Sequence, residues 1–182
     1  IRDVLARALE CLGAGDGRRA IDVGCGAGND TRHILNAGFD VLAIDASTDG
    51  INRLTARPEA KDNPHLKTQI ATYRNMVLSE NVFTNAGFAL PFCAPEDFPD
   101  VWKNITQHIE KGGVFSGQLF GPEDSWKEKV SDMSFHDRQA LEDLFYGFET
   151  LYLREEKTPG KDATGRPKFW HIFHVVLKKQ TD

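Results

Sequence analysis

A glycine-rich turn between a strand-like and a helix-like segment constrains this sequence more than any other feature. The turn Gly24–Gly28 has glycine at every second position and directly follows the short run Ala20–Val23, which is typical of a buried strand. The residues after the turn, as far as Ala37, are typical of a helix. Glycine at a strand-to-helix turn permits a tight bend and a close approach of the backbone to a ligand. The sequence therefore predicts a ligand-binding turn at the carboxyl end of a strand.

Two acidic residues indicate what the ligand carries. Asp22 stands just before the turn, where its carboxylate would repel a diphosphate and attract an ammonium group. Asp45 ends a second strand-like run about twenty residues further on, where a carboxylate can accept hydrogen bonds from both ribose hydroxyls. The glycine spacing is Gly-x-Gly-x-Gly, whereas dinucleotide sites have Gly-x-Gly-x-x-Gly. An amine and a ribose without a phosphate describe S-adenosylmethionine better than a nicotinamide cofactor.

Hydrophobic periodicity and turn signals predict an alternation of strands and helices. Helices are expected over residues 1–12, 29–37, 47–57, 95–110 and 134–145, and strands over 20–23, 40–45, 68–73, 82–89, 114–120, 148–154 and 169–178. Gly112 and Gly113 should end the fourth helix, and Ser134 with Asp137 should form a capping box for the fifth. The last two strands, with a polar loop over 158–165, predict an antiparallel hairpin over 148–178. The fold class is α/β, a doubly wound Rossmann-like sheet with helices on both faces.

Length and composition favour one compact domain over residues 1–182 that binds a small molecule. The net charge of −5 disfavours nucleic acid as a partner. No apolar run is long enough to span a membrane, and no signal peptide is visible, although a leader removed before Ile1 stays an alternative. Three widely spaced cysteines, at positions 11, 25 and 93, predict a reducing, cytoplasmic location. The sequence indicates no oligomeric state.

The segments Asp22–Gly28 and Ala43–Asp45 resemble the first two motifs of class I S-adenosylmethionine-dependent methyltransferases. The order of expected elements is also similar to that family, and in particular to its small stand-alone members that act on tellurite or thiopurines. The resemblance implies a seven-stranded sheet whose last strand is antiparallel. It also implies that Asp22 faces the methionine amine and that Asp45 binds the ribose. The other cofactor-binding positions that it implies are Gly24, Cys25, Gly26, Gly28, Ala46, Thr72, Tyr73 and Asn85.

The acceptor is expected near the ends of the fourth and fifth strands. Asn85 and Phe88 occupy the outer positions of the motif of exocyclic-amine methylases, but Ala86 and Gly87 replace its prolines, which counts against base methylation. His136 would lie in the first turn of the fifth helix, whose N-terminus lowers the pKa of the imidazole and favours its neutral form. The substrate-pocket candidates are Phe88, Phe92, Gln118 and Trp126, and the candidates for a catalytic role are Asn85, Gln118 and His136.

Plainer interpretations of these residues stay open. Packing at the end of a strand is the alternative for Asn85 and Phe88, and a lid over the core is the alternative for Trp126. For Asp45 the alternative is a helix-capping or surface acid, and for His136 it is a surface position. No metal-ligand spacing occurs, because His171 and His174 would point to opposite faces of one strand.

The function expected is methyl transfer from S-adenosylmethionine, by in-line displacement, to a small-molecule acceptor. An NAD(P)-dependent oxidoreductase and a non-catalytic S-adenosylmethionine-binding module are the alternatives.

Overall fold

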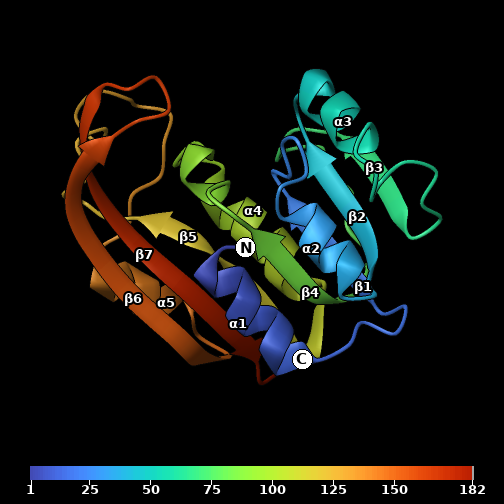
Figure 1. Ribbon diagram of the computed structural model, residues 1–182. Helices are drawn as coiled ribbons and strands as arrows, with labels where there is room; N and C mark the ends of the chain where they lie inside the picture. The colour runs from blue at the N-terminus through green and yellow to red at the C-terminus, as the bar shows by residue number, and fades with distance from the viewer. Residues whose placement is uncertain (182) are drawn as a thin grey trace.

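The computed structural model describes residues 1–181, in which seven strands form one sheet in the order β3-β2-β1-β4-β5-β7-β6 (Figure 1). The strands are β1 (Arg19–Val23), β2 (Asp40–Asp45), β3 (Leu66–Ile70), β4 (Asn81–Ala86), β5 (Ile109–Phe120), β6 (Phe148–Lys161) and β7 (Pro167–Lys179). β1 pairs in parallel with both β2 and β4, so the strand order reverses at β1. Doubly wound sheets bind ligands at such a switch point. The predicted fold class is confirmed.

Helices cover both faces of the sheet, as expected (Figure 1). They are α1 (Asp3–Leu12), α2 (Thr31–Asn36), α3 (Thr48–Thr55), α4 (Phe98–Gln107) and α5 (Arg138–Leu144), with a 3₁₀ turn, η1 (Leu90–Phe92). The helices α1 to α3 bury their apolar stripes in one core cluster, which includes Leu5, Ile34 and Leu54. The helices α4 and α5 contribute to the other, with Trp102 and Leu141. Ser47 caps α3 as its sequence predicts, its Oγ accepting from the Gly50 amide at 3.0 Å.

The terminal hairpin is confirmed, but its strands are longer than predicted. β7 lies between β5 and β6 and is antiparallel to both, so it alone runs against the parallel strands. Residues 158–161, expected in the loop, continue β6 and pair with β7. Pro159 and Gly160 are tolerated there because β6 is the edge strand, where one side of the backbone needs no partner. The turn itself is closed by Asp162, whose Oδ1 accepts from the amides of Thr164 and Arg166.

The capping box expected at Ser134 is wrong. Ser134 is buried, and its hydroxyl donates to the carbonyl of Cys93 at 2.7 Å. Asp137 caps α5 instead, its Oδ1 accepting from the Ala140 amide at 2.9 Å. A buried hydrogen bond to a distant segment therefore determines the conformation of Ser134, and the local capping pattern does not.

The boundary between the fourth helix and the fifth strand is also different from the prediction. α4 ends at Gln107, and Gly112 and Gly113 lie inside β5. Gly112 has a φ of +80°, and a Cβ on Gly113 would lie 2.9 Å from the carbonyl oxygen of Val82 on β4. The two glycines therefore accommodate an irregularity between β4 and β5, where the register shifts.

Candidate active site

The glycine turn is folded over the end of β2. The amides of Gly24 and Cys25 both donate to the carbonyl of Ile44, at 2.8 and 3.0 Å. Gly24, Gly26 and Gly28 have φ values of +68°, +51° and +77°, a region that favours glycine. Cys25 is buried, and burial raises the pKa of its thiol, so it packs in the turn as an uncharged side chain. The turn presents its backbone at the switch point of the sheet.

Asp22 is buried beneath this turn, at 1% exposure. Its Oδ2 accepts from the hydroxyl of Thr31 at 2.6 Å and its Oδ1 from the amide of Asn85 at 2.8 Å. Burial raises the pKa of Asp22 to about 7, although both hydrogen bonds act in the opposite direction. The carboxylate is therefore poised to ionise when a positive group arrives.

Arg2 and Asp30 are site residues that the sequence reasoning missed. Nη1 of Arg2 lies 2.5 Å from Oδ2 of Asp30, which also contacts the Asn85 amide at 3.3 Å. Both side chains line a cavity of about 160 Å³ together with Asp22 and the residues 24–27 of the turn. Asp30 lies two residues beyond the glycine motif, at the N-cap position of α2, where its side chain makes no capping hydrogen bond. No local signal in the sequence connects Arg2 to this site.

Asp45 borders a second cavity, of about 300 Å³, on the other side of the turn. Its Oδ2 accepts from the Gly26 amide at 2.7 Å and its Oδ1 from the Ser47 amide at 2.8 Å. Each of these oxygens keeps a second lone pair. Asp45 thus both stabilises the turn and retains acceptor capacity toward the cavity. The remaining lining residues are Val23, Gly24, Ile44, Ala46, Ala71, Thr72, Tyr73, Met76 and Phe92.

The structure brings Thr72 and Tyr73 to this cavity although neither lies on a strand. β3 ends at Ile70, three residues earlier than predicted, and both residues belong to the turn that follows. The Tyr73 hydroxyl donates to the carbonyl of Ala89 at 2.6 Å. Phe92, predicted as a substrate residue, lines the same cavity and is 51% exposed.

Asn85 and Gln118 lie on neighbouring strands but have different surroundings. Asn85 is 1% exposed, and its Oδ1 accepts from Ser116 at 2.8 Å while its amide contacts Asp22 and Asp30. These contacts make Asn85 an internal support of Asp22. Gln118 is also buried, and its Oε1 accepts from the Phe88 amide at 2.9 Å. Gln118 therefore fixes the backbone of Phe88, which has a φ of +54°.

An aromatic cluster lies beyond the carboxyl end of β5. Phe88 and Phe92 each place their ring centre within 6.4 Å of that of Phe120, and the Phe92 centre is 6.1 Å from that of Trp126. Phe92 also lines the second cavity, so it connects this cluster to the turn. Three of the four predicted substrate residues, Phe88, Phe92 and Trp126, therefore belong to one aromatic cluster, called the aromatic wall below.

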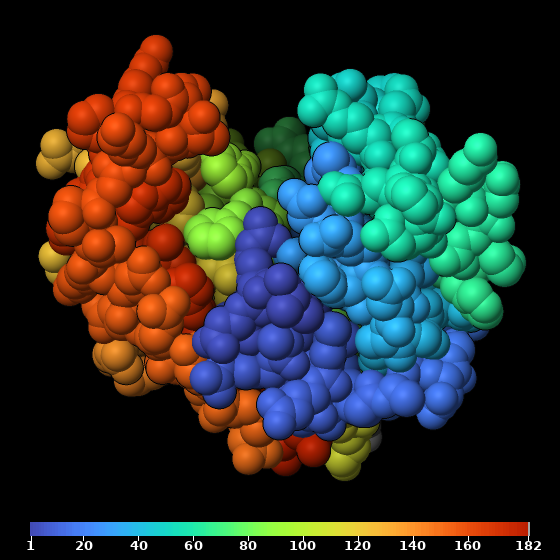
Figure 2. All heavy atoms as spheres, viewed as in Figure 1, coloured from blue at the N-terminus to red at the C-terminus, as the bar shows by residue number. Residues whose placement is uncertain are grey.

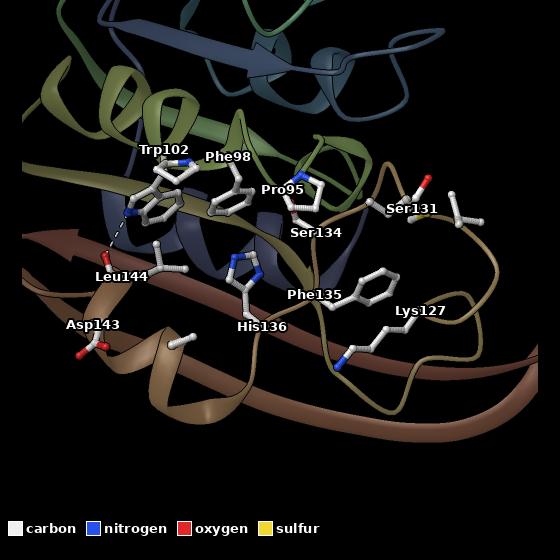
Figure 3. Close-up of a pocket in the computed structure, with 14 residues that line it drawn as sticks. Pro95, Phe98, Trp102, Lys127, Ser131, Ser134, Phe135, His136, Asp143 and Leu144 are labelled. Carbon is white, nitrogen blue, oxygen red and sulfur yellow. Dashed lines mark hydrogen bonds between the residues drawn. The ribbon is translucent and has the colours of Figure 1, made fainter.

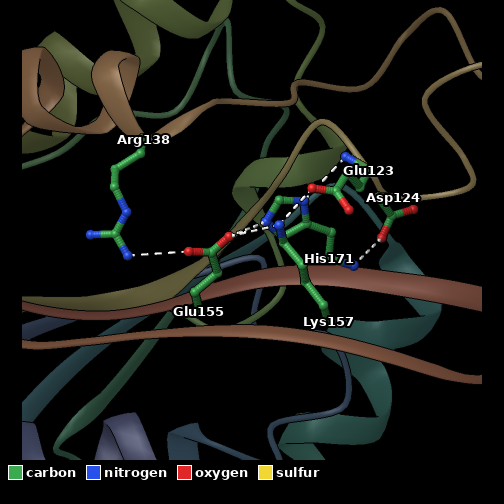
Figure 4. A network of polar contacts seen from close by, with 6 residues as sticks. All are labelled: Glu123, Asp124, Arg138, Glu155, Lys157 and His171. Atoms are coloured by element: carbon green, nitrogen blue, oxygen red, sulfur yellow. Dashed lines mark hydrogen bonds and ion pairs between the residues drawn. The ribbon is translucent and has the colours of Figure 1, made fainter.

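A polar network joins the segment after β5 to the hairpin (Figure 4). Glu155 on β6 contacts Arg138 at 3.1 Å, Lys157 at 3.3 Å and Nε2 of His171 at 3.0 Å. Nδ1 of His171 accepts from the Glu123 amide at 3.1 Å, so its proton is on Nε2. The pKa of Glu155 is lowered, and the hydrogen bond from Arg138 is the largest cause.

The segment that carries Trp126 is held a second time by a buried ion pair between Lys168 and Asp124. Nζ of Lys168 lies 3.8 Å from the ring centre of Trp126 and 4.2 Å from that of Trp170. A lysine in this setting attaches the loop to β7 through both charge and cation–π contacts.

His136 lies outside the two cavities beside the glycine turn, and its predicted setting is wrong. It precedes α5 and does not belong to its first turn. The pKa of its imidazole is lowered to about 4, which is the predicted direction. The cause is burial against Phe98, however, and not the helix N-terminus that was expected to lower it. His136 lines another pocket, on the α4–α5 side.

The space-filling view shows one hollow between the hairpin tip and α3 (Figure 2). The N-terminal segment lies at its lower edge, and atoms of the chain that follows β4 are visible in its floor. Among residues 1–181, no group of three or more His, Cys, Asp or Glu side chains is arranged to hold a metal ion. In the same residues, no helix has the length and apolar character needed to cross a membrane.

Comparison with protein families identifies the class of this chain. Residues 20–113 match the family described as methyltransferase domain. The chain therefore belongs to the methyltransferase domain family, and its class is that of the class I S-adenosylmethionine-dependent methyltransferases, as the two motifs indicated. S-adenosylmethionine is the cofactor of this class. No curated protein sequence matches the chain.

Solved structures show the same fold. TehB from Haemophilus influenzae superposes with a TM-score of 0.81 at 17% identity, over 99% of this chain and 63% of TehB, so this chain spans less than two thirds of that protein. The N-methyltransferase NodS from Bradyrhizobium japonicum WM9, in complex with S-adenosyl-L-homocysteine, superposes with a TM-score of 0.74 at 14% identity. The superposition covers 97% of this chain and 84% of NodS. An S-adenosylmethionine-dependent methyltransferase from Mesorhizobium loti superposes with a TM-score of 0.70 at 16% identity, and the superposition covers 96% of each chain.

Proposed function

We propose that this protein transfers a methyl group from S-adenosylmethionine to a small-molecule acceptor. The observation that carries the proposal is that two cavities with different chemistry share Gly24. One holds charged side chains of both signs, and the other combines a carboxylate with apolar walls. An amino acid joined to a nucleoside needs two such compartments side by side.

The charged cavity suits the methionine end of the cofactor. Asp22 and Asp30 supply negative charge for an ammonium group, and Arg2 supplies positive charge for a carboxylate. Because Asp22 is buried, its attraction to an ammonium group is screened less by water than that of an exposed acid. The backbone of Gly24, Cys25, Gly26 and Gly28 would lie along the same end.

The larger cavity suits the adenosine end. Asp45 has free lone pairs for the ribose hydroxyls, and Ala46 lies next to it on the cavity wall. Thr72, Tyr73 and Phe92 complete the wall, and the apolar faces of Ile44 and Met76 would cover a planar base.

The acceptor would bind against the aromatic wall formed by Phe88, Phe92 and Trp126. When bound, S-adenosylmethionine supplies a methyl group already activated by a sulfonium charge. The protein then contributes mainly orientation, which can lower a barrier by up to about 7–11 kcal/mol. Gln118 acts in this scheme by fixing the backbone of Phe88, and Asn85 by holding Asp22. An aromatic wall favours a small acceptor with an apolar body.

Calorimetric titration with S-adenosylmethionine, S-adenosylhomocysteine and NAD⁺ tests the cofactor. The first two should bind with a stoichiometry of one, and NAD⁺ should not. Transfer of a tritiated methyl group to a mixed library of small thiols, amines, phenols and inorganic tellurite and selenite tests the activity. Binding without transfer to any compound would favour a non-catalytic module, and binding of NAD⁺ alone would overturn the proposal.

A further inference from the structure

A pocket of about 650 Å³ lies on the α4–α5 side of the molecule and shares no lining residue with the two cofactor cavities. It is an open pocket bordered by α4, α5 and the segment that ends at His136 (Figure 3). Its volume falls within the range of about 300–1,000 Å³ that is usual for small-molecule sites. Nothing in the proposed methyl transfer uses it.

The walls of this pocket are mostly apolar and partly aromatic. The rings of Phe98 and Trp102 on α4 are nearly parallel, with an interplanar angle of 11° and centres 6.3 Å apart. The Trp102 indole is held in place because its Nε1 donates to the carbonyl of Leu144 at 3.1 Å. Phe135 and Met133 also line the pocket. These walls suit a flat, apolar ring.

His136 is the polar group in this pocket that has no partner. Its Nδ1 is buried without a hydrogen bond, so a ligand could reach this half-buried ring only at Nε2. The ring centre lies 4.3 Å from that of Phe98, so the imidazole is fixed by packing. Burial lowers its pKa to about 4, which leaves it neutral, with one N–H, near pH 7. In the tautomer with its proton on Nε2, the neutral imidazole offers this N–H to a ligand acceptor.

Two charged side chains of opposite sign, Lys127 and Asp143, line the pocket, and they lie on different sides of it. In Figure 3 the ammonium end of Lys127 lies on the side of His136 and Phe135, whereas the carboxylate of Asp143 points away from the pocket. Lys127 is exposed and free to move toward an anion. A cation and an N–H donor on one side of an apolar slot are complementary to a carboxylate attached to a ring.

We propose that this pocket is a second ligand site, separate from the cofactor crevice, that binds a planar aromatic carboxylate. The ring would lie between the α4 rings and the 127–136 segment, with the carboxylate toward Lys127 and His136. The same segment contacts the residues next to Phe92, since the Ser134 hydroxyl donates to Cys93 at 2.7 Å. A ligand here would therefore be connected to the proposed adenosine cavity through Ser134, Cys93 and Phe92.

The test uses 2-naphthoate as probe, with 2-naphthylmethanol as its uncharged analogue, in calorimetric or NMR titrations of the full chain. Naphthoate should bind saturably, with or without saturating S-adenosylhomocysteine, and at least tenfold more tightly than the alcohol. Ala140→Trp, which fills the pocket from α5, should abolish binding, whereas Gln139→Trp, on an exposed neighbouring position, should not. Lys127→Gln should weaken binding at least threefold, and Lys129→Gln, which does not line the pocket, should leave it unchanged.

Three results would overturn the proposal. No saturable binding of naphthoate to the wild-type protein is the first. The second is loss of naphthoate binding when S-adenosylhomocysteine is present, which would place the probe in the cofactor crevice. The third is equal binding to Ala140→Trp and Gln139→Trp variants whose circular dichroism spectra match that of the wild type.

Discussion

Asp22 and Asn85 are direct neighbours on β1 and β4, and Nδ2 of Asn85 donates to Oδ1 of Asp22 at 2.8 Å. The other end of the same amide accepts from Ser116 on β5 at 2.8 Å. Three adjacent strands are thereby connected below the glycine turn, and the Asp22 carboxylate is fixed in orientation. Burial raises the pKa of this acid although its hydrogen bonds lower it, and two predictions depend on the raised value.

Cofactor binding should weaken as the pH falls below about 7. The Asp22 carboxyl has a pKa of about 7 in the free protein, and only its charged form attracts an ammonium group. The affinity for S-adenosylhomocysteine should fall on the order of tenfold from pH 8 to pH 6, with proton release on binding near pH 6.5. Calorimetry in phosphate and Tris buffers measures both quantities. Asp22→Asn should bind more weakly at pH 8 and lose this pH dependence. An affinity that rises toward acid pH would contradict the role of Asp22.

The same carboxyl should make the unliganded protein less stable as the pH rises. Its folded pKa of about 7 lies above the ordinary value of 3.8, so between these pH values the folded state holds a proton that the unfolded state has lost. Stability therefore falls with rising pH in that window, by about 2–3 kcal/mol between pH 5 and pH 8. Urea unfolding of the wild type and of Asp22→Asn at both pH values measures the free energy of unfolding of each. Relative to the wild type, Asp22→Asn should be more stable at pH 8 than it is at pH 5. The same difference in unfolding free energy between the two proteins at both pH values would contradict the raised pKa of Asp22.

Removing the Asp45 carboxylate should weaken cofactor binding with little loss of fold. Asp45→Ala deletes the acceptors for the amides of Gly26 and Ser47 and, in the proposed complex, for the ribose hydroxyls. We expect a loss of about 1–3 kcal/mol in binding S-adenosylmethionine, measured by calorimetry. Asp49→Ala, which removes an exposed acid paired with Arg53 on α3, is the matched control and should bind normally. Equal affinity in both variants would remove Asp45 from the site.

Gly24 and Gly26, two of the three glycines in the turn, should differ in how much a substitution by alanine lowers stability. Both have positive φ, so either substitution costs roughly 1–2 kcal/mol of backbone strain. At Gly24 the new Cβ would also collide with that of Ala89, whereas at Gly26 nothing lies within 4 Å. Gly24→Ala should therefore lower stability by about 1–3 kcal/mol more than Gly26→Ala. Thermal unfolding of the two variants decides this, and the reverse order would show that the turn is packed differently.

The buried ion pair should matter more than an exposed one nearby. Lys168→Met leaves Asp124 buried without its cation and should destabilise the fold by about 3–5 kcal/mol in urea unfolding. Lys157→Met, which removes an exposed partner of Glu123, should leave the unfolding midpoint close to that of the wild type. Adding Asp124→Asn to Lys168→Met should recover part of the loss, because it removes the unpaired charge. Similar midpoints for the two single variants would contradict the burial of Lys168.

Local patterns were sufficient to predict the glycine turn and the existence of the terminal hairpin. The strand, the glycine turn and the acid before it lie within residues 20–28, and the hairpin within 148–179, so period and turn chemistry predicted both. The same reasoning failed at Ser134, because its partner is the carbonyl of Cys93, 41 residues away. It also failed at Gly112 and Gly113, because the strand β4 beside them is not visible in the local sequence.

The sequence by itself determined the fold class, the family motifs and the positions of Asp22 and Asp45, because each depends on residues close together in the chain. Only the tertiary structure brought Arg2 to Asp30 and Asn85 to Asp22 and left the His136 imidazole unpartnered beside Phe98. Those relationships arise from packing between elements far apart in the sequence. Burial, which sets the pKa of Asp22 and of His136, exists only after that packing is complete.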